Sequence, residues 1–437
     1  MKPLLIAIVL LLTGSLVNAA DLLGVYESAA YNNPTLAAAA ASLEATRENR
    51  PQAMASLLPN INAGGSVTRA RFKNHNPSED ATYSTDKLAA VELVQPLFDY
   101  DSWIALKQTD STIAAAEADY AAAQQALMID AAERYFKVLD AQDNLEFAKA
   151  EKSSIGRQLD QAKQRFDVGL IAITDVKAAQ ARYDLADSLE IRALSDLYGA
   201  RDSLLELTGE YYEDIDRLRE DLQLTRPDPD SLEDWIARAK EQNLSVLSAQ
   251  ATSEAARQEM RRQRAGHLPT LDLNASAGYQ DANFGGIAPI ERQDSEIGIR
   301  LNVPIYQGGA VNSRTRQARS RFEEATQLLQ QAVRTAELDT RTAWRGVLTD
   351  IAQVRALKQS LESTSIAVES EEAGFEVGTR TIVDVLNAQR ESFLARLNYA
   401  RARYLYVVDQ LRLKRAAGIL TQKDLVEVNR SLTSKPR

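Results

Sequence analysis

Residues 166–176, FDVGLIAITDV, return about 209 positions later as residues 375–385, FEVGTRTIVDV. An Ala-Gln pair follows at the same spacing in both copies, which indicates an internal two-fold sequence repeat. The fourth residue of each copy is a glycine, Gly169 and Gly378, and glycine is typical of the left-handed position that ends a helix. The tenth residue is an aspartate, which is expected to cap the helix that follows. The repeat therefore predicts two helical hairpins with similar turns.

Each half also contains two stretches in which apolar and polar residues alternate. This is the period of a strand with one apolar face, and it is strictest at 271–279 and 296–305. Strands are predicted near 58–72, 85–97, 268–280 and 293–306. Roughly 9 to 11 tilted residues cross a bilayer as a strand, so these stretches are long enough to do so.

Most of the remaining sequence carries a helical pattern. Two stretches of about 68 residues, near 101–168 and 310–377, are predicted to be long helices. Shorter helices are predicted near 22–56, 175–208, 231–266 and 384–417. Apolar residues of the return helices follow a 3-4-3-4 spacing, which is that of a coiled-coil seam. Two short helices placed end to end match one long helix, so each chain offers four helical columns and four strands.

Four strands cannot close a membrane barrel, because about eight or more are needed. Inside lipid, every strand edge must be paired. A dimer would give a filled barrel, whereas a trimer gives twelve strands with room for a pore. The predicted fold class is therefore mixed: an all-α tube of stacked helices plus a membrane β-barrel, in a homotrimer with a 12-stranded barrel.

The chain is predicted to have five parts. Residues 1–19 are typical of a secretory signal peptide, with Lys2 before a short apolar run and a small-x-small site. Cleavage is expected after Ala19, with Ala20 as the alternative. The other parts are a first repeat at 20–209, a linker or equatorial belt at 210–230, a second repeat at 231–418 and a C-terminal equatorial tail at 419–437.

Composition argues against several classes of function. The 437 residues include no cysteine and two histidines, which leaves little material for a metal site or a Ser-His-Asp triad. His75 and His267 are expected to lie in a polar loop and a turn. The formal charge of −10 argues against nucleic acid as a partner. No Walker-type glycine loop or paired catalytic motif is present, so neither an enzyme nor a cofactor is expected.

The sequence resembles the TolC family of outer-membrane efflux proteins over nearly the whole mature chain. The matching motifs are residues 165–176, 266–273, 304–309 and 377–386. The resemblance implies a trimer with a barrel in the bacterial outer membrane and a helical barrel in the periplasm. It also implies work with an inner-membrane transporter and a periplasmic adaptor. The implied function is an exit duct for drugs or secreted proteins, and the sequence does not separate these two substrates.

The resemblance further implies a pore constriction at the hairpin turns. The narrowest part of the family's tube is ringed by carboxylates, and Asp384 matches a ring position. The family's second acid, three residues later, is Asn387 here. The ring would therefore carry one carboxylate per chain instead of two, which weakens the expected preference for cations.

The resemblance also implies a lock that keeps the periplasmic tip closed. The family holds the tip shut by contacts between the two turns and across chains. The matching residues are Thr174, Asp175 and Arg380, with Phe375 in place of the usual tyrosine. Arg380 suits this task because its planar fork can hold a carboxylate with two bonds.

Simpler interpretations remain for these residues and for the chain. Helix capping alone explains Asp175 and Asp384, and a solvated side chain explains Arg380. A trimeric coiled-coil structural or adhesive surface protein would share the heptads. It would not need four amphipathic strands inserted between the helices.

Overall fold

The computed structural model describes residues 20–73, 82–284 and 290–433. The expected signal peptide, His75 and the last four residues of the expected tail lie outside these ranges. The described helices are α1 (Leu22–Asn32), α2 (Pro34–Arg47), α3 (Asn49–Ala55), α4 (Tyr100–Asp167), α5 (Ile173–Thr208), α6 (Leu232–Gln242), α7 (Leu244–Ala265), α8 (Ala310–Glu376), α9 (Ile382–Ala416) and α10 (Gln422–Arg430). The described strands are β1 (Asn60–Phe72), β2 (Thr82–Phe98), β3 (Arg217–Leu218), β4 (Thr270–Phe284), β5 (Ile290–Asn302) and β6 (Leu432–Thr433).

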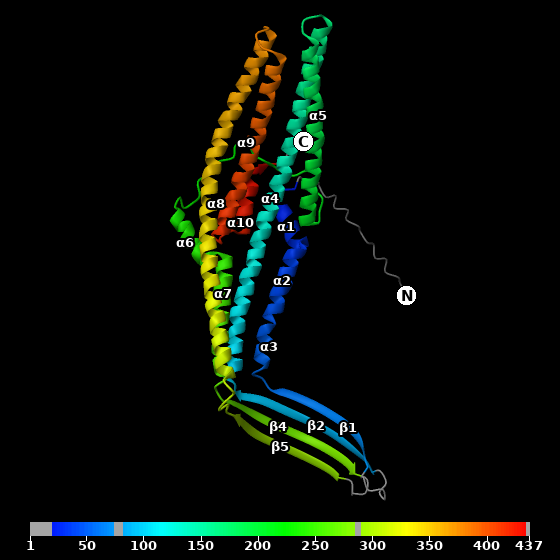
Figure 1. The fold of residues 1–437 in the computed structure, drawn as a ribbon, viewed down its shortest axis with the longest axis vertical. Coiled ribbons are helices and arrows are strands. Elements are labelled where there is room, and N and C mark those ends of the chain that lie inside the picture. The colour runs from blue at the N-terminus through cyan, green and yellow to red at the C-terminus, as the bar shows by residue number, and fades with distance from the viewer. Residues whose placement is uncertain (1–19, 74–81, 285–289, 434–437) are drawn as a thin grey trace, which may run out of the picture. The chain divides into compact units, whose positions relative to one another are not determined.

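The chain divides into two compact units. The first comprises Met1–Ala37, Ala123–Ala239 and Glu337–Arg437, and the second comprises Ala38–Ala122 and Lys240–Ala336. The two long helices have 68 and 67 residues, as the sequence predicts. Each is followed by a return helix, so that α4 with α5 and α8 with α9 form two antiparallel hairpins (Figure 1).

Two of the predicted shorter helices are interrupted. The stretch near 22–56 is split into α1, α2 and α3, and the stretch near 231–266 is split into α6 and α7. Asn33 and Asn243 stand at matching breaks of the two repeats. The side-chain oxygen of Asn243 accepts hydrogen bonds from two amides of the next helix, at 3.0 and 3.3 Å. Each asparagine therefore starts a new helix, because its side chain competes with the backbone for these amides.

The two hairpins of the first unit pack through α4 and α9. The rings of Phe136 and Tyr404 are stacked with their centroids 5.6 Å apart. Arg401 pairs with Asp140 at 2.6 Å on the same pair of helices. The stacked rings fix the position of α4 along α9, and the ion pair adds a second contact between these helices at the surface.

The linker and the tail are paired with each other. In the two-stranded sheet, Arg217 stands opposite Thr433 and Leu218 opposite Leu432. The linker also binds α9, where the hydroxyl of Tyr406 accepts from the amide of Thr225 at 2.8 Å. The last described residues are therefore fixed against the segment that joins the two repeats.

The second unit contains a four-stranded antiparallel sheet in the order β1-β2-β4-β5. The strand predicted near 293–306 ends earlier, at Asn302. Pro304 follows, and because proline has no N–H it cannot continue the ladder. Gly308 and Gly309 then take positive φ values of 61° and 82° before α8 begins.

The two faces of this sheet differ in character. Odd-numbered residues place exposed apolar side chains on one face, among them Ile61, Val67, Val91, Ile297, Ile299 and Leu301. Even-numbered residues place mainly small or polar side chains on the other face, among them Asn62, Ser66, Glu92, Ser276 and Glu296. The alternation seen in the sequence is therefore a real division between the two faces.

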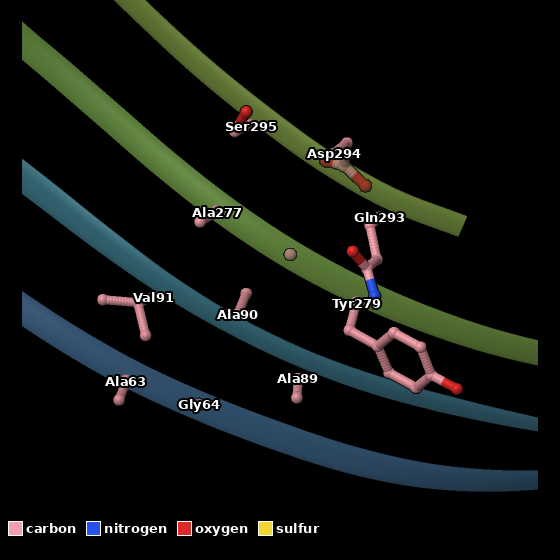
Figure 2. Close-up of a pocket in the computed structure, with 11 residues that line it drawn as sticks. Ala63, Gly64, Ala89, Ala90, Val91, Ala277, Tyr279, Gln293, Asp294 and Ser295 are labelled. Carbon is pink, nitrogen blue, oxygen red and sulfur yellow. The ribbon is translucent and has the colours of Figure 1, made fainter. Parts of the chain in front are cut away.

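A shallow cavity of about 670 Å³ lies against the middle of the sheet (Figure 2). Its lining is mostly small, as the labelled alanines in the figure show. Gly64, Ala90, Gly278 and Asp294 stand opposite one another on the four strands. This band of the sheet therefore carries little side-chain volume on its even-numbered face.

Within the part of the chain that the structure describes, no helix has both the length and the apolar character of a membrane span.

Candidate functional site

The turn between α4 and α5 closes by a Schellman motif. The amide of Gly169 donates to the carbonyl of Phe166 at 2.8 Å, and that of Leu170 donates to the carbonyl of Arg165 at 2.8 Å. Gly169 has a φ of 78°, a backbone conformation that residues with a Cβ rarely adopt. The glycine therefore ends the helix in the way that the repeat predicts.

The turn between α8 and α9 repeats this motif. The amide of Gly378, whose φ is 81°, donates to the carbonyl of Phe375 at 3.2 Å, and that of Thr379 donates to the carbonyl of Gly374 at 2.9 Å. A Cβ on Gly374 would lie 2.6 Å from Cγ of Arg380. The stem of Arg380 thus packs directly on this glycine, a contact that no sequence motif indicates.

Asp384 belongs to a complete capping box. Thr381 is the N-cap of α9, and its backbone N and hydroxyl donate to Oδ2 of Asp384 at 2.9 and 2.7 Å. These hydrogen bonds, with a smaller contribution from the charge of Arg380, lower the pKa of Asp384. The carboxylate therefore has a structural partner at the start of α9.

The turn between α4 and α5 lacks this capping box, because the N-cap of α5 is Ala172, which has no hydroxyl. Asp175 and Asp384 are both the third residue of their helices, not the capping residue itself. The expectation that each aspartate opens its helix is therefore wrong by position. Only Asp384 takes part in capping, because Thr381 at the N-cap exchanges hydrogen bonds with it.

Arg380 is held within its own hairpin. Its Nε lies 3.3 Å from Oε2 of Glu371, and its side chain is 56% exposed. Among the described residues, Glu371 is its ion-pair partner. Thr174 is exposed and Asp175 is half-buried on the other hairpin.

Asn387 is brought against a residue of the neighbouring hairpin. Nη2 of Arg182 on α5 donates to Oδ1 of Asn387 on α9 at 3.1 Å. Burial raises the pKa of Glu151 on α4, and the guanidinium groups of Arg390 and Arg182 partly oppose this rise. The expected constriction residue is therefore beside a cation that sequence reasoning did not identify.

A buried amide provides a second link between the hairpins. Gln389 is 7% exposed, and its Oε1 accepts from the hydroxyl of Ser154 at 3.0 Å. Its Nε2 donates to Oε1 of Glu372 at 2.7 Å. One side chain of α9 therefore joins α4 to α8. A buried amide with both ends satisfied fixes the relative height of its partners.

Phe375 takes part in the apolar contact between the hairpins. It packs on a buried cluster formed by Ile155, Ala186, Ile382 and Leu386. The guanidinium carbon of Arg165 lies 4.4 Å from its ring centroid. A cation–π contact between Arg165 and Phe375 therefore joins the two hairpins at the position where the resemblance would place a tyrosine.

Comparison with known proteins agrees with this fold. The family model described as "Outer membrane efflux protein" matches residues 25–210 and 235–419. The chain is 37% identical to "Outer membrane protein TolC" of Escherichia coli (strain K12), over 99% of this chain and 89% of that protein. It is 30% identical to "Alkaline protease secretion protein AprF" of Pseudomonas aeruginosa, over 93% of this chain and 86% of that protein.

Solved structures show the same fold at lower identity. The CmeC outer membrane channel of Campylobacter jejuni aligns with a TM-score of 0.78 and 19% identity, over 94% of this chain and 90% of that one. The outer membrane protein VceC of Vibrio cholerae aligns with a TM-score of 0.77 and 19% identity, over 91% and 96%. With most of its length matched by the family model and close relatives covered almost end to end, the chain belongs to the outer membrane efflux protein family.

Proposed function

We propose that this protein is an exit duct in the bacterial outer membrane, through which an export system releases drugs or secreted proteins. The observation that carries the proposal is a sheet with two open edges and one exposed apolar face, in a chain of this family. Such a sheet is incomplete by itself, because lipid offers no partner for the unpaired N–H and C=O groups of an edge.

Closure of the sheet supports a homotrimer. The edge strands β1 and β5 have 13 residues each. Three copies that pair β1 of one chain with β5 of the next would form a 12-stranded barrel, which has room for a pore. The exposed apolar face would then meet lipid, and the helical hairpins would form the periplasmic tube. The paired linker and tail would form a belt on that tube.

Substrate and partners are inferred from the relatives. AprF is named for the secretion of a protease, and other members of the family are named as efflux proteins. A passive duct of this kind needs an inner-membrane transporter and a periplasmic adaptor to load it. The substrate class would then be set by the transporter.

Gating would occur at the hairpin turns. The bonds of Arg182 with Asn387 and of Ser154 with Gln389 would hold the hairpins of one chain together. Asp384 would place a carboxylate in the constriction. Thr174, Asp175 and Arg380 would supply contacts between chains, with Phe375 packed beneath them.

Reconstitution in a planar lipid bilayer tests the proposed function. The purified full chain should insert and give a stable conductance. It should also restore dye efflux to a strain that lacks its own outer-membrane duct. A chain that is soluble without detergent and gives no conductance would instead be a trimeric coiled-coil surface protein, and the proposal would be wrong.

A further inference from the structure

The apolar face of β1 changes character along its length. Toward the helices, the odd-numbered positions carry Ile61, Ala63, Gly65 and Val67. The next two odd-numbered positions are Arg69 and Arg71, and both are exposed. The strand therefore turns from apolar to basic on one face, at the end that lies away from the helices.

An aromatic ring joins the two arginines. Tyr83 on β2 stands opposite Arg71 in the ladder. The guanidinium carbons of Arg69 and Arg71 lie 5.6 and 5.9 Å from the centroid of its ring. The ring holds both cations on the same face through cation–π attraction, and it leaves their N–H groups free to donate.

The acidic side chains that the described strands place on this face are already engaged. Asp281 on β4 pairs with Lys87 at 2.9 Å, and Glu291 on β5 accepts from the hydroxyl of Tyr279 at 2.9 Å. Among the described residues, neither Arg69 nor Arg71 has an ion-pair partner. Within the described strands, the two guanidinium groups are thus without a carboxylate partner, and they lie beside a band of exposed apolar side chains.

We propose that Arg69 and Arg71 bind the phosphate groups of an anionic lipid headgroup in the outer leaflet. This rests on the proposed function, because the apolar face must meet lipid for a headgroup to reach the arginines. The order along β1 fits a lipid molecule, with acyl chains beside Ile61 and Val67 and phosphate beside Arg69 and Arg71. Guanidinium groups suit this ligand, since their planar fork can bind two phosphate oxygens at once.

Binding of bisphosphorylated lipid A tests the site. The wild-type trimer and the R69Q/R71Q variant would be placed in phosphatidylcholine nanodiscs with EDTA, and bound lipid A would be counted by native mass spectrometry. The wild type should bind at least about tenfold more tightly than the variant, because charge-assisted hydrogen bonds are lost. The matched control R292Q/R300Q removes two arginines from the opposite face of the same sheet and should bind like the wild type.

Several results would overturn the site. Equal binding by the wild type and R69Q/R71Q would do so, and so would equal binding of lipid A without its phosphates. Displacement of the lipid by millimolar inorganic phosphate would show a free-anion site instead. If R69Q/R71Q and E291Q both dissociate the trimer in neutral lipid, the arginines pair with Glu291 of a neighbouring copy. A wild-type chain that does not insert or conduct would overturn the proposed function itself, and the conductance measured beforehand separates that failure from the others.

Discussion

Arg182 and Asn387 lie 205 residues apart in the sequence, yet the guanidinium of one donates to the amide oxygen of the other at 3.1 Å. The bond joins α5 to α9 and hence one helical hairpin to the other. Because the acceptor is a neutral amide, the bond is weaker than an ion pair would be. The proposed gate requires a weak bond of this kind, because a docking partner would have to break it.

Loss of this bond should loosen the hairpins. Arg182→Ala or Asn387→Ala is expected to raise the open fraction about two- to tenfold, since a typical hydrogen bond contributes about 0.5–1.5 kcal/mol. Single-channel conductance without partner proteins measures the change, and the double variant should be less than additive. Arg192→Ala removes an exposed arginine from the same helix and should leave conductance unchanged. Wild-type conductance in both single variants would show that other contacts close the tip.

Asp384 has both a structural role and a negative charge, and two substitutions can separate the effects of the two. Asp384→Asn keeps an oxygen that can accept from Thr381 but removes the charge, whereas Asp384→Ala removes both. Both variants should reduce cation preference in bilayer recordings, and Asp384→Ala should also lower the stability of α9 at its start.

The pH dependence of this charge follows from the same hydrogen bonds. They lower the pKa of Asp384, so the carboxylate should stay charged until the pH falls below the usual titration range of an aspartate. Cation preference that persists unchanged in Asp384→Asn would assign the residue to capping alone.

The oligomeric state should be a trimer in detergent. The reason is the pair of open sheet edges, which only neighbouring copies of β1 and β5 can close. Sedimentation velocity with correction for bound detergent gives the mass of the protein component. A stable folded monomer would refute the closure of the barrel by three chains.

The apolar face of the sheet should not tolerate charge. Ile299 is 68% exposed in the single chain, and Ile299→Arg is expected to cost about 2–4 kcal/mol on a lipid-facing strand. Gly298→Arg is the matched control, because the neighbouring residue points to the other face and has open space around its Cβ position. The yield of membrane-inserted trimer measures both. A lower yield for Gly298→Arg than for Ile299→Arg would mean that the faces are assigned the wrong way round, and equal yields would contradict the lipid contact of the apolar face.

Stability should depend on pH through a pair of carboxyl groups. Burial and the negative charge of Asp409 raise the pKa of Asp350 to about 6. The folded chain thus holds this proton more tightly than the unfolded chain, in which an aspartate has a pKa of about 3.9. Stability should therefore decrease as the pH rises from about 4 through about 6.

Asp350→Asn removes this dependence. The variant should melt at a higher temperature than the wild type at pH 7.5 and show less difference at pH 4. Asp339→Asn, at an exposed position of the same helix, should follow the wild type at both values. A melting difference between Asp350→Asn and the wild type that does not change with pH would contradict the assignment.

The sequence by itself determined the features of the structure that depend on residues close together in the sequence. The long helices, the alternating strands and the turns at Gly169 and Gly378 follow from periodicity and from residues only a few positions apart. The breaks at Asn33 and Asn243 had a local signal too, since asparagine is a common N-cap, but the helical period around them hid it.

The tertiary structure alone decided which side chains meet between the hairpins. Nothing local indicates that Arg182 binds Asn387, or that Gln389 joins Ser154 to Glu372. These contacts depend on the relative height and rotation of long helices. A shift of one turn, about 5.4 Å, would exchange every partner while leaving the local pattern of each helix unchanged.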